Sequence, residues 1–134
     1  MNVRLEVDGP SVPDLLRDLA SWLDREPGLV GRVDLIEKGP EPGQLGPMLE
    51  ALQFTVTALS SAIGASSLIV NWLQFRKPDV TIRVFIDREG QVLSATAEKA
   101  KSDAGELEQR LAQELSKAVE QETEGDSGEG PTSL

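Results

Sequence analysis

The chain has 134 residues, a formal net charge of −10, no histidine and no cysteine. This length suits one domain with a single hydrophobic core. The acidic balance argues against nucleic acid as a partner, because neutralising phosphates requires an extended basic surface. The absence of cysteine excludes disulfides and thiolate metal sites.

The N-terminal part of the chain predicts a strand, a helix and a second strand. Apolar and polar residues alternate in NVRLEVD, which is typical of a half-buried strand, and Gly9-Pro10 ends the pattern. Residues 13–25 predict an amphipathic helix with Ser11 as its N-cap. The sequence GRVDLIEKG predicts a short second strand, and residues 38–46, rich in Gly and Pro, predict an irregular loop.

The central and C-terminal parts predict two further helices and a β-hairpin. Residues 45–75 predict one long helix, which Pro78 closes. The sequences DVTIRVFID and QVLSATA predict two antiparallel strands joined by the turn REG. The last helix is predicted from apolar residues repeated every four positions: Leu107, Leu111, Leu115 and Val119.

The predicted element order is β-α-β-α-β-β-α, which indicates an α+β fold. A four-stranded sheet would pack against the long central helix and the two shorter helices. We predict a single domain over residues 1–120. Residues 121–134 are acidic and rich in Gly and Ser, which predicts a disordered acidic C-terminal tail.

Residues 51–75 contain no charged side chain, so a membrane span, a buried core helix and a docking surface all have to be weighed. A spanning helix would place the first two strands and the last two strands on opposite sides of the bilayer. Each pair would then be an isolated ribbon, which is marginally stable in water. A core helix in a soluble protein is therefore the favoured interpretation, and a helix that docks or inserts conditionally is the alternative.

A helical wheel of residues 45–75 gives an apolar stripe that includes Leu59 and Ile63 and, beside it, a polar seam. The apolar and small surface is wider than one sheet requires, so part of it is available for a partner protein or a second copy of the chain. The polar seam consists of Gln53, Thr57, Ser60, Gly64, Ser67, Asn71 and Gln74. The predicted docking face, on the far side of the wheel, consists of Phe54, Leu68, Trp72 and Phe75.

The residue types available for chemistry are few. Without His and Cys, the commonest general base, the thiol nucleophile and two common metal ligands are missing. The glycines in GPEPGQLG lack phosphate-loop spacing, and no GK[ST] follows them. We therefore expect no catalytic residues, no cofactor and no metal, and predict that the protein is not an enzyme.

Residues 3–97 resemble the effector-associated constant component family, first type. The resemblance rests on WL..EP.L.GRV, followed by a helix of small residues that ends in WL..R.PDVT. It implies a non-enzymatic accessory component of a bacterial conflict system, acting with an effector such as a caspase-like or trypsin-like peptidase. The resemblance assigns no site residues.

Two functional hypotheses remain at this point. The first is an adaptor that docks through its central helix on an effector or on a copy of itself. The second is a membrane-active component whose central helix, residues 45–75, inserts into the bilayer. The N-terminus lacks the basic and apolar segments of a secretory signal, so we expect a cytoplasmic protein, with conditional association with the inner membrane under the second hypothesis.

Overall fold

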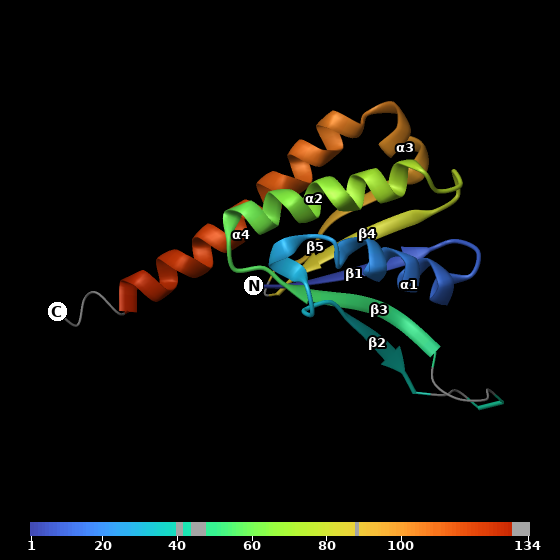
Figure 1. Ribbon diagram of the computed structural model, residues 1–134, viewed down its shortest axis with the longest axis horizontal. Helices are drawn as coiled ribbons and strands as arrows, with labels where there is room; N and C mark the ends of the chain where they lie inside the picture. The colour runs from blue at the N-terminus through green and yellow to red at the C-terminus, as the bar shows by residue number, and fades with distance from the viewer. Residues whose placement is uncertain (40–41, 44–47, 88, 130–134) are drawn as a thin grey trace.

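The computed structural model of the chain describes residues 1–39, 42–43, 48–87 and 89–129. These residues form five strands and four helices, with one 3-10 turn (Figure 1). In chain order the elements are β1 (Asn2–Asp8), α1 (Val12–Leu23), η1 (Pro27–Leu29), β2 (Asp34–Lys38), β3 (Met48–Thr55), α2 (Leu59–Gln74), β4 (Thr81–Ile86), β5 (Gly90–Thr96), α3 (Ala97–Ser102) and α4 (Ala104–Glu129).

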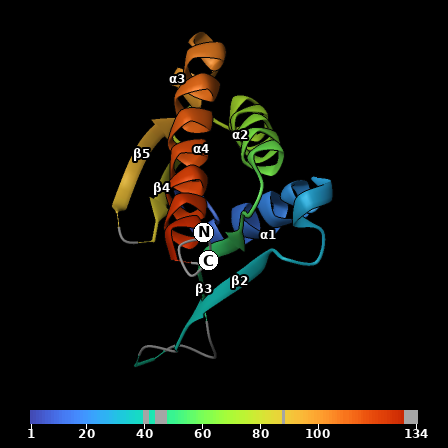
Figure 2. The ribbon, with the colours of Figure 1, turned by 90° about the vertical axis from the view of Figure 1, so that its left-hand side faces the viewer.

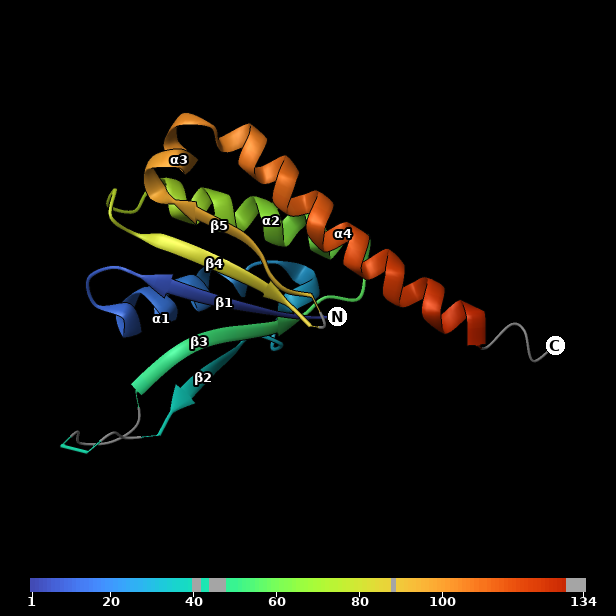
Figure 3. The same ribbon diagram turned by 180° about the vertical axis from the view of Figure 1, so that it is seen from behind.

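The strands form one antiparallel sheet in the order β2-β3-β1-β4-β5, which Figure 3 shows from behind. The helices lie on one side of this sheet (Figure 2). The predicted α+β class is therefore confirmed, with five strands in place of four.

The alternation in β1 decides which side of the sheet carries the core. Val3, Leu5 and Val7 are buried beneath the helices, and the residues between them lie on the opposite face. Leu5 is paired with Leu52 of β3 on one side and with Val84 of β4 on the other. The inner face is thus continuous and apolar across the three central strands.

The predicted helix over residues 45–75 is wrong in its first half. Residues 48–55 form β3, and α2 begins only at Leu59; residues 45–47 lie outside the described residues. In β3, Leu52 and Phe54 point to the core while Gln53 and Thr55 lie on the other face. Pairing with both β1 and β2 supplies ladder partners for the backbone of β3, which overrides the helical reading of an uncharged sequence.

Helix α2 has 16 residues and lies between α1 and α4 (Figures 1 and 2). It packs against both neighbouring helices, most extensively against α4. Across the described part of the chain, no helix is both long enough and apolar enough to cross a membrane.

The N-terminal helix and the terminal β-hairpin follow the predictions closely. Helix α1 begins after Ser11, but the Ser11 side chain makes no capping hydrogen bond, because its backbone is left-handed (φ 59°). The carbonyl of Ser11 accepts the first helical hydrogen bond, from the Leu15 amide at 3.0 Å. Strands β4 and β5 form the predicted antiparallel hairpin. The predicted loop over residues 38–46 lies mostly outside the described residues.

Helix α4 closes the helical layer and then projects beyond the sheet (Figure 1). Its buried side chains include all four predicted apolar positions, Leu107, Leu111, Leu115 and Val119. The helix continues to Glu129, whereas the sequence predicts disorder from residue 121. Residues 130–134 lie outside the described residues, and the disordered tail stays a prediction.

The assignment of residues 48–55 to a strand can be tested by substituting two neighbours that point to opposite faces. Phe54→Ala should lower the free energy of unfolding by about 3–5 kcal/mol, because the Phe54 side chain is only 1% exposed. Gln53→Ala on the open face should cost less than about 1 kcal/mol. Urea unfolding followed by circular dichroism measures both values. Equal costs for the two variants would contradict the register of β3.

Candidate docking surface on helix α2

The four residues of the predicted docking face lie at separate places in the fold. Phe54 lies in β3 on the core side of the sheet, and Trp72 of α2 is 1% exposed. Leu68 is half-buried and packs against the core. Phe75, which ends α2, is the one side chain of the four that is largely exposed, at 74%.

The predicted polar seam is only partly on α2, since Gln53 belongs to β3 and Thr57 precedes the helix. The remaining five residues are exposed or half-buried along the solvent side of α2: Ser60, Gly64, Ser67, Asn71 and Gln74. This part of the seam therefore faces solvent and not the interior of a helix bundle.

Trp72 orients α2 against α1 through a polar contact at the edge of the core. Its indole Nε1 donates a hydrogen bond of 2.9 Å to Asp18 Oδ2 of α1. Arg76 Nη1 reaches the same oxygen at 2.9 Å, and its guanidinium lies over the Trp72 ring, 4.9 Å from the centroid. The Trp72 ring can therefore be buried, because the Asp18 carboxylate accepts the hydrogen bond of its only polar group.

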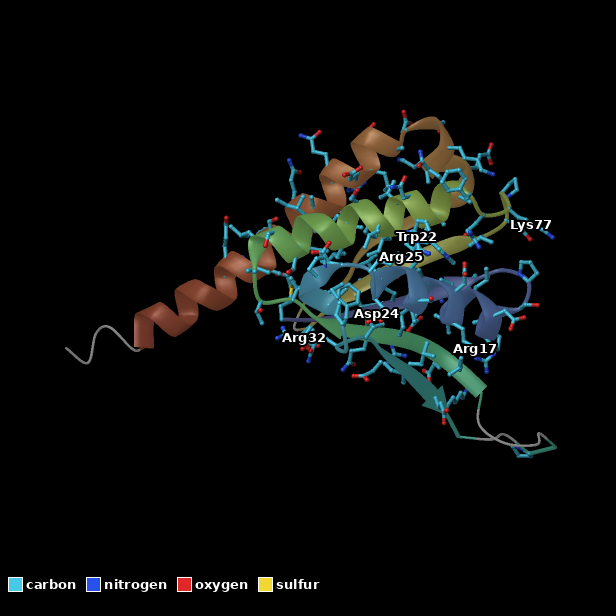
Figure 4. All side chains as sticks on the ribbon, viewed as in Figure 1. Arg17, Trp22, Asp24, Arg25, Arg32 and Lys77 are labelled. Carbon is cyan, nitrogen blue, oxygen red and sulfur yellow. The ribbon has the colours of Figure 1, made fainter. Side chains whose placement is uncertain are left out.

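Trp22 makes a second contact between the same two helices. Its indole Nε1 donates to the Leu68 carbonyl of α2 at 2.9 Å. Arg25 lies over the Trp22 ring, 4.4 Å from its centroid. Figure 4 shows Trp22 and Arg25 in the region where α1 meets α2. The position of α2 on α1 is therefore fixed at two points along its length.

Two exposed apolar side chains lie in the first two turns of α2. Leu59 and Ile63 are one helical turn apart and are 43% and 54% exposed. Val30, 60% exposed, follows η1, and the η1 region contacts the side of α2 that carries Ser61 and Gly64. At 100° per residue that side lies about 100–160° around the helix from Leu59 and Ile63, so Val30 is separate from them. We call the two residues Leu59 and Ile63 the N-terminal patch.

The η1 turn packs closely on α2 at Gly28. A Cβ atom on Gly28 would overlap the Ser61 side chain and lie 2.9 Å from its Cβ. A Cβ on Gly64 would meet only the Glu26 carboxylate, the far end of a flexible side chain that can move aside. Glycine at position 28 therefore permits an approach that a larger residue would obstruct.

The helical wheel placed Leu59 and Ile63 in the apolar stripe expected to face the core, so the sequence prediction missed the patch. In the structure the buried side of the N-terminal half of α2 consists of small residues, and that of the C-terminal half consists of larger ones: Ser61, Ala62, Ala65 and Ser66, then Ile69, Val70, Trp72 and Leu73. The Ser66 hydroxyl is satisfied within the helix by the Ala62 carbonyl at 2.8 Å. The row of small residues in the sequence could have predicted the buried side of this part of α2, since closely packed helices favour small residues at their contacts.

The open face of the sheet carries a ladder of ion pairs. Arg4 pairs with Glu6 at 3.0 Å and with Glu50 at 2.9 Å, and Arg83 pairs with Glu6 at 3.1 Å and with Asp8. Partial burial lowers the pKa of Arg83, but hydrogen bonds and the charges of Glu6 and Asp8 raise it by more, so its net pKa lies above the ordinary value. The two arginines of the ladder are thus opposed by three carboxylates: Glu6, Asp8 and Glu50.

The described residues contain no group of three or more His, Cys, Asp or Glu side chains able to hold a metal ion. The carboxylates of the ladder are engaged with arginines, which favours a structural role for them. The N-terminal patch is therefore the strongest candidate functional surface in the described part of the chain.

The fit of η1 on α2 can be tested with two Gly→Ala variants. Gly28→Ala should lower the free energy of unfolding by about 1–3 kcal/mol, because the new methyl group overlaps Ser61 on a buried side of α2. Gly105→Ala in α4 is the control, since its Cβ meets open space, and it should be neutral or stabilising by up to about 1 kcal/mol. Chemical denaturation provides both values, and a neutral Gly28→Ala would refute the close contact.

The Trp72 contact can be tested at Asp18. Asp18→Ala removes the acceptor of the indole N–H and should cost about 1–2 kcal/mol in unfolding free energy. Asp18→Asn keeps an oxygen acceptor for the indole and loses the ion pair with Arg76. The Asp18 side chain is 56% exposed, so losing this ion pair should cost less than about 1 kcal/mol. Should both variants cost the same, the charge and not the hydrogen bond would be the stabilising element.

Comparison with known proteins agrees with the resemblance found in the sequence. The family model of Effector Associated Constant Component 1 matches residues 8–116. No curated protein and no solved structure matches the chain significantly. The match covers most of the chain and runs from the end of β1 into α4. The chain therefore belongs to the Effector Associated Constant Component 1 family.

Proposed function

We propose that this protein is a non-enzymatic adaptor of a bacterial conflict system, which couples to an effector such as a caspase-like or trypsin-like peptidase. The family supports association with an effector. The observation that carries the proposed mode of coupling is the N-terminal patch, where two apolar side chains are exposed on a tightly packed helix.

The patch suits a reversible protein contact. Burying a large aliphatic side chain completely contributes about 1.5–3 kcal/mol, and about half of each patch side chain is still exposed. Covering both would thus contribute on the order of 1.5–3 kcal/mol to binding. Because α2 is held by α1 and α4, little conformational entropy is lost when a partner docks.

A coupling role also agrees with the residue types in the chain. With no His and no Cys, the chain lacks the nucleophile and base of a cysteine peptidase and the base of a serine peptidase. In this proposal the peptidase supplies the chemistry and the present protein supplies the contact.

The proposal is tested by replacing the apolar residues of the patch with glutamine, which is polar and also favours a helix. The double variant Leu59→Gln, Ile63→Gln should bind the caspase-like or trypsin-like effector peptidase at least about tenfold more weakly than the wild type. Isothermal titration calorimetry or a quantitative pull-down measures this change. The fold should be retained, because both side chains are largely exposed.

The matched control places glutamine at two other exposed positions of the same helix, Ser60→Gln and Asn71→Gln. This control should bind the peptidase as the wild type does. Unchanged binding by a folded Leu59→Gln, Ile63→Gln variant would show that the patch is not the docking surface. Circular dichroism and the melting temperature establish that both proteins are folded.

A further inference from the structure

The turn between η1 and β2 exposes an arginine whose side chain has no partner among the described residues. Val30, Gly31 and Arg32 are all exposed, Val30 to 60%. The Arg32 amide donates to the Leu29 carbonyl at 2.9 Å, which closes the turn. In the described part of the chain, the Arg32 guanidinium makes no hydrogen bond, ion pair or ring contact. Exposed turns are where proteolytic cleavage of folded proteins concentrates.

Strand β2, which follows this turn, is the one strand of the five without a buried residue. It lies at the edge of the sheet and is hydrogen-bonded to β3 on one side only. Its register with β3 is interrupted between Ile36 and Glu37, and its other substantial contact is with α1. An edge strand that buries so little apolar surface opens locally at a low cost in free energy.

These two features together make the turn accessible to a peptidase. Trypsin-like peptidases bind an Arg or Lys side chain in an acidic S1 pocket and cleave the peptide bond that follows it. They also need several residues on both sides of that bond in an extended conformation. Before Arg32, Val30 and Gly31 are already outside the core, and opening of β2 supplies the residues after it. Cleavage of a folded protein follows the population of such an open form.

Most of the other basic residues lie where regular structure holds the backbone. Arg4 and Arg83 belong to the paired strands β1 and β4 and take part in ion pairs. Five basic residues lie within helices: Arg17, Lys99, Lys101, Arg110 and Lys117. The peptide bond after each of these residues becomes accessible only when a central strand or a helix unfolds locally.

Three further basic residues follow the ends of α1 and α2. The guanidinium groups of Arg25 and Arg76 are each stacked on a tryptophan ring. Lys77 is followed by Pro78, and a proline in this position obstructs cleavage because its ring replaces the N–H of the peptide bond. These three positions are therefore poorer sites than Arg32.

We infer that Arg32–Val33 is the bond at which a peptidase of trypsin-like specificity cleaves this protein in its folded state. The peptidase adds one water molecule across the bond, which leaves a carboxyl group on Arg32 and an amine on Val33. If the proposed function holds with a trypsin-like effector, the effector cleaves its own accessory component at this turn.

The two fragments remain bound to each other after cleavage. Fragment 1–32 contains β1, α1 and η1, and β1 is paired with both β3 and β4 of fragment 33–134. Its buried apolar side chains belong to the same core cluster as those of the larger fragment. The indole of Trp22 also donates its hydrogen bond to the Leu68 carbonyl across the two fragments. Cleavage therefore removes the covalent link to β2 and leaves the N-terminal patch in place.

The site is tested on the full chain with trypsin as the probe and no effector present, so its failure is separate from failure of the proposed function. Digestion at a low ratio of trypsin to protein, followed by mass spectrometry, should yield fragments 1–32 and 33–134 first. Arg32→Gln should slow the loss of intact chain at least about tenfold. The matched controls are Lys38→Gln at the end of β2 and Arg88→Gln, which lies outside the described residues. Both should be cleaved at the wild-type rate. A first cut after another residue, or an unchanged rate in Arg32→Gln, overturns the inference.

Gel filtration of the cleaved protein tests whether the fragments stay together. They should elute as one species in buffer and as two in concentrated urea, and separation in buffer would contradict the retained pairing of β1. Incubation with a trypsin-like effector should give the same two fragments. An effector that binds the protein and leaves Arg32–Val33 intact would refute the role of this cut in the conflict system while leaving the proposed adaptor function standing.

Discussion

Strand β1 is the element on which the other elements of the fold depend. It is paired on one side with β3 and on the other with β4, and so joins the β2–β3 pair to the β4–β5 hairpin. Its inward side chains Val3, Leu5 and Val7 lie beneath the helices. Because only one face of β1 is apolar, all the helices must pack on that face, and the other face is left to the ion pairs of Arg4 and Arg83.

Because all the helices lie on one face of the sheet, they pack against one another, and only their outer sides are accessible to a partner. Helix α2 is enclosed by the sheet, α1 and α4, and it is held to α1 by the indole N–H groups of Trp22 and Trp72. In its first two turns the small residues Ser61, Ala62, Ala65 and Ser66 are on the buried side, and Leu59 and Ile63 are exposed. The exposure of the N-terminal patch is thus a consequence of the orientation of α2 about its own axis, which its contacts with α1 and α4 fix.

The N-terminal patch offers side chains to a partner. Its contribution to the binding free energy scales with the apolar area that the partner covers. Because the patch lies on a helix that α1 and α4 hold in place, a partner meets a surface that is already ordered.

The predictive power of the sequence varied with the part of the chain. Period-two alternation in β1 and β4 and the four-residue repeat in α4 gave the correct elements, because each pattern has one periodicity only. Residues 48–55 were misassigned, since in an uncharged segment Leu52 and Phe54 fit a helical stripe as well as a strand. The same ambiguity explains why the residues predicted for docking lie apart: Phe54 belongs to a strand, and Trp72 is buried.

By itself, the sequence determined the fold class, the family and the lack of the usual catalytic side chains, because these depend on composition and local pattern. Only the tertiary structure decided where the charge-free segment changes from strand to helix, since that choice depends on the pairing of β3 with β1 and β2. It also decided which side of α2 meets solvent. A helical wheel gives relative angles between residues, whereas absolute orientation is fixed by contacts with distant elements, here α1, α4 and η1.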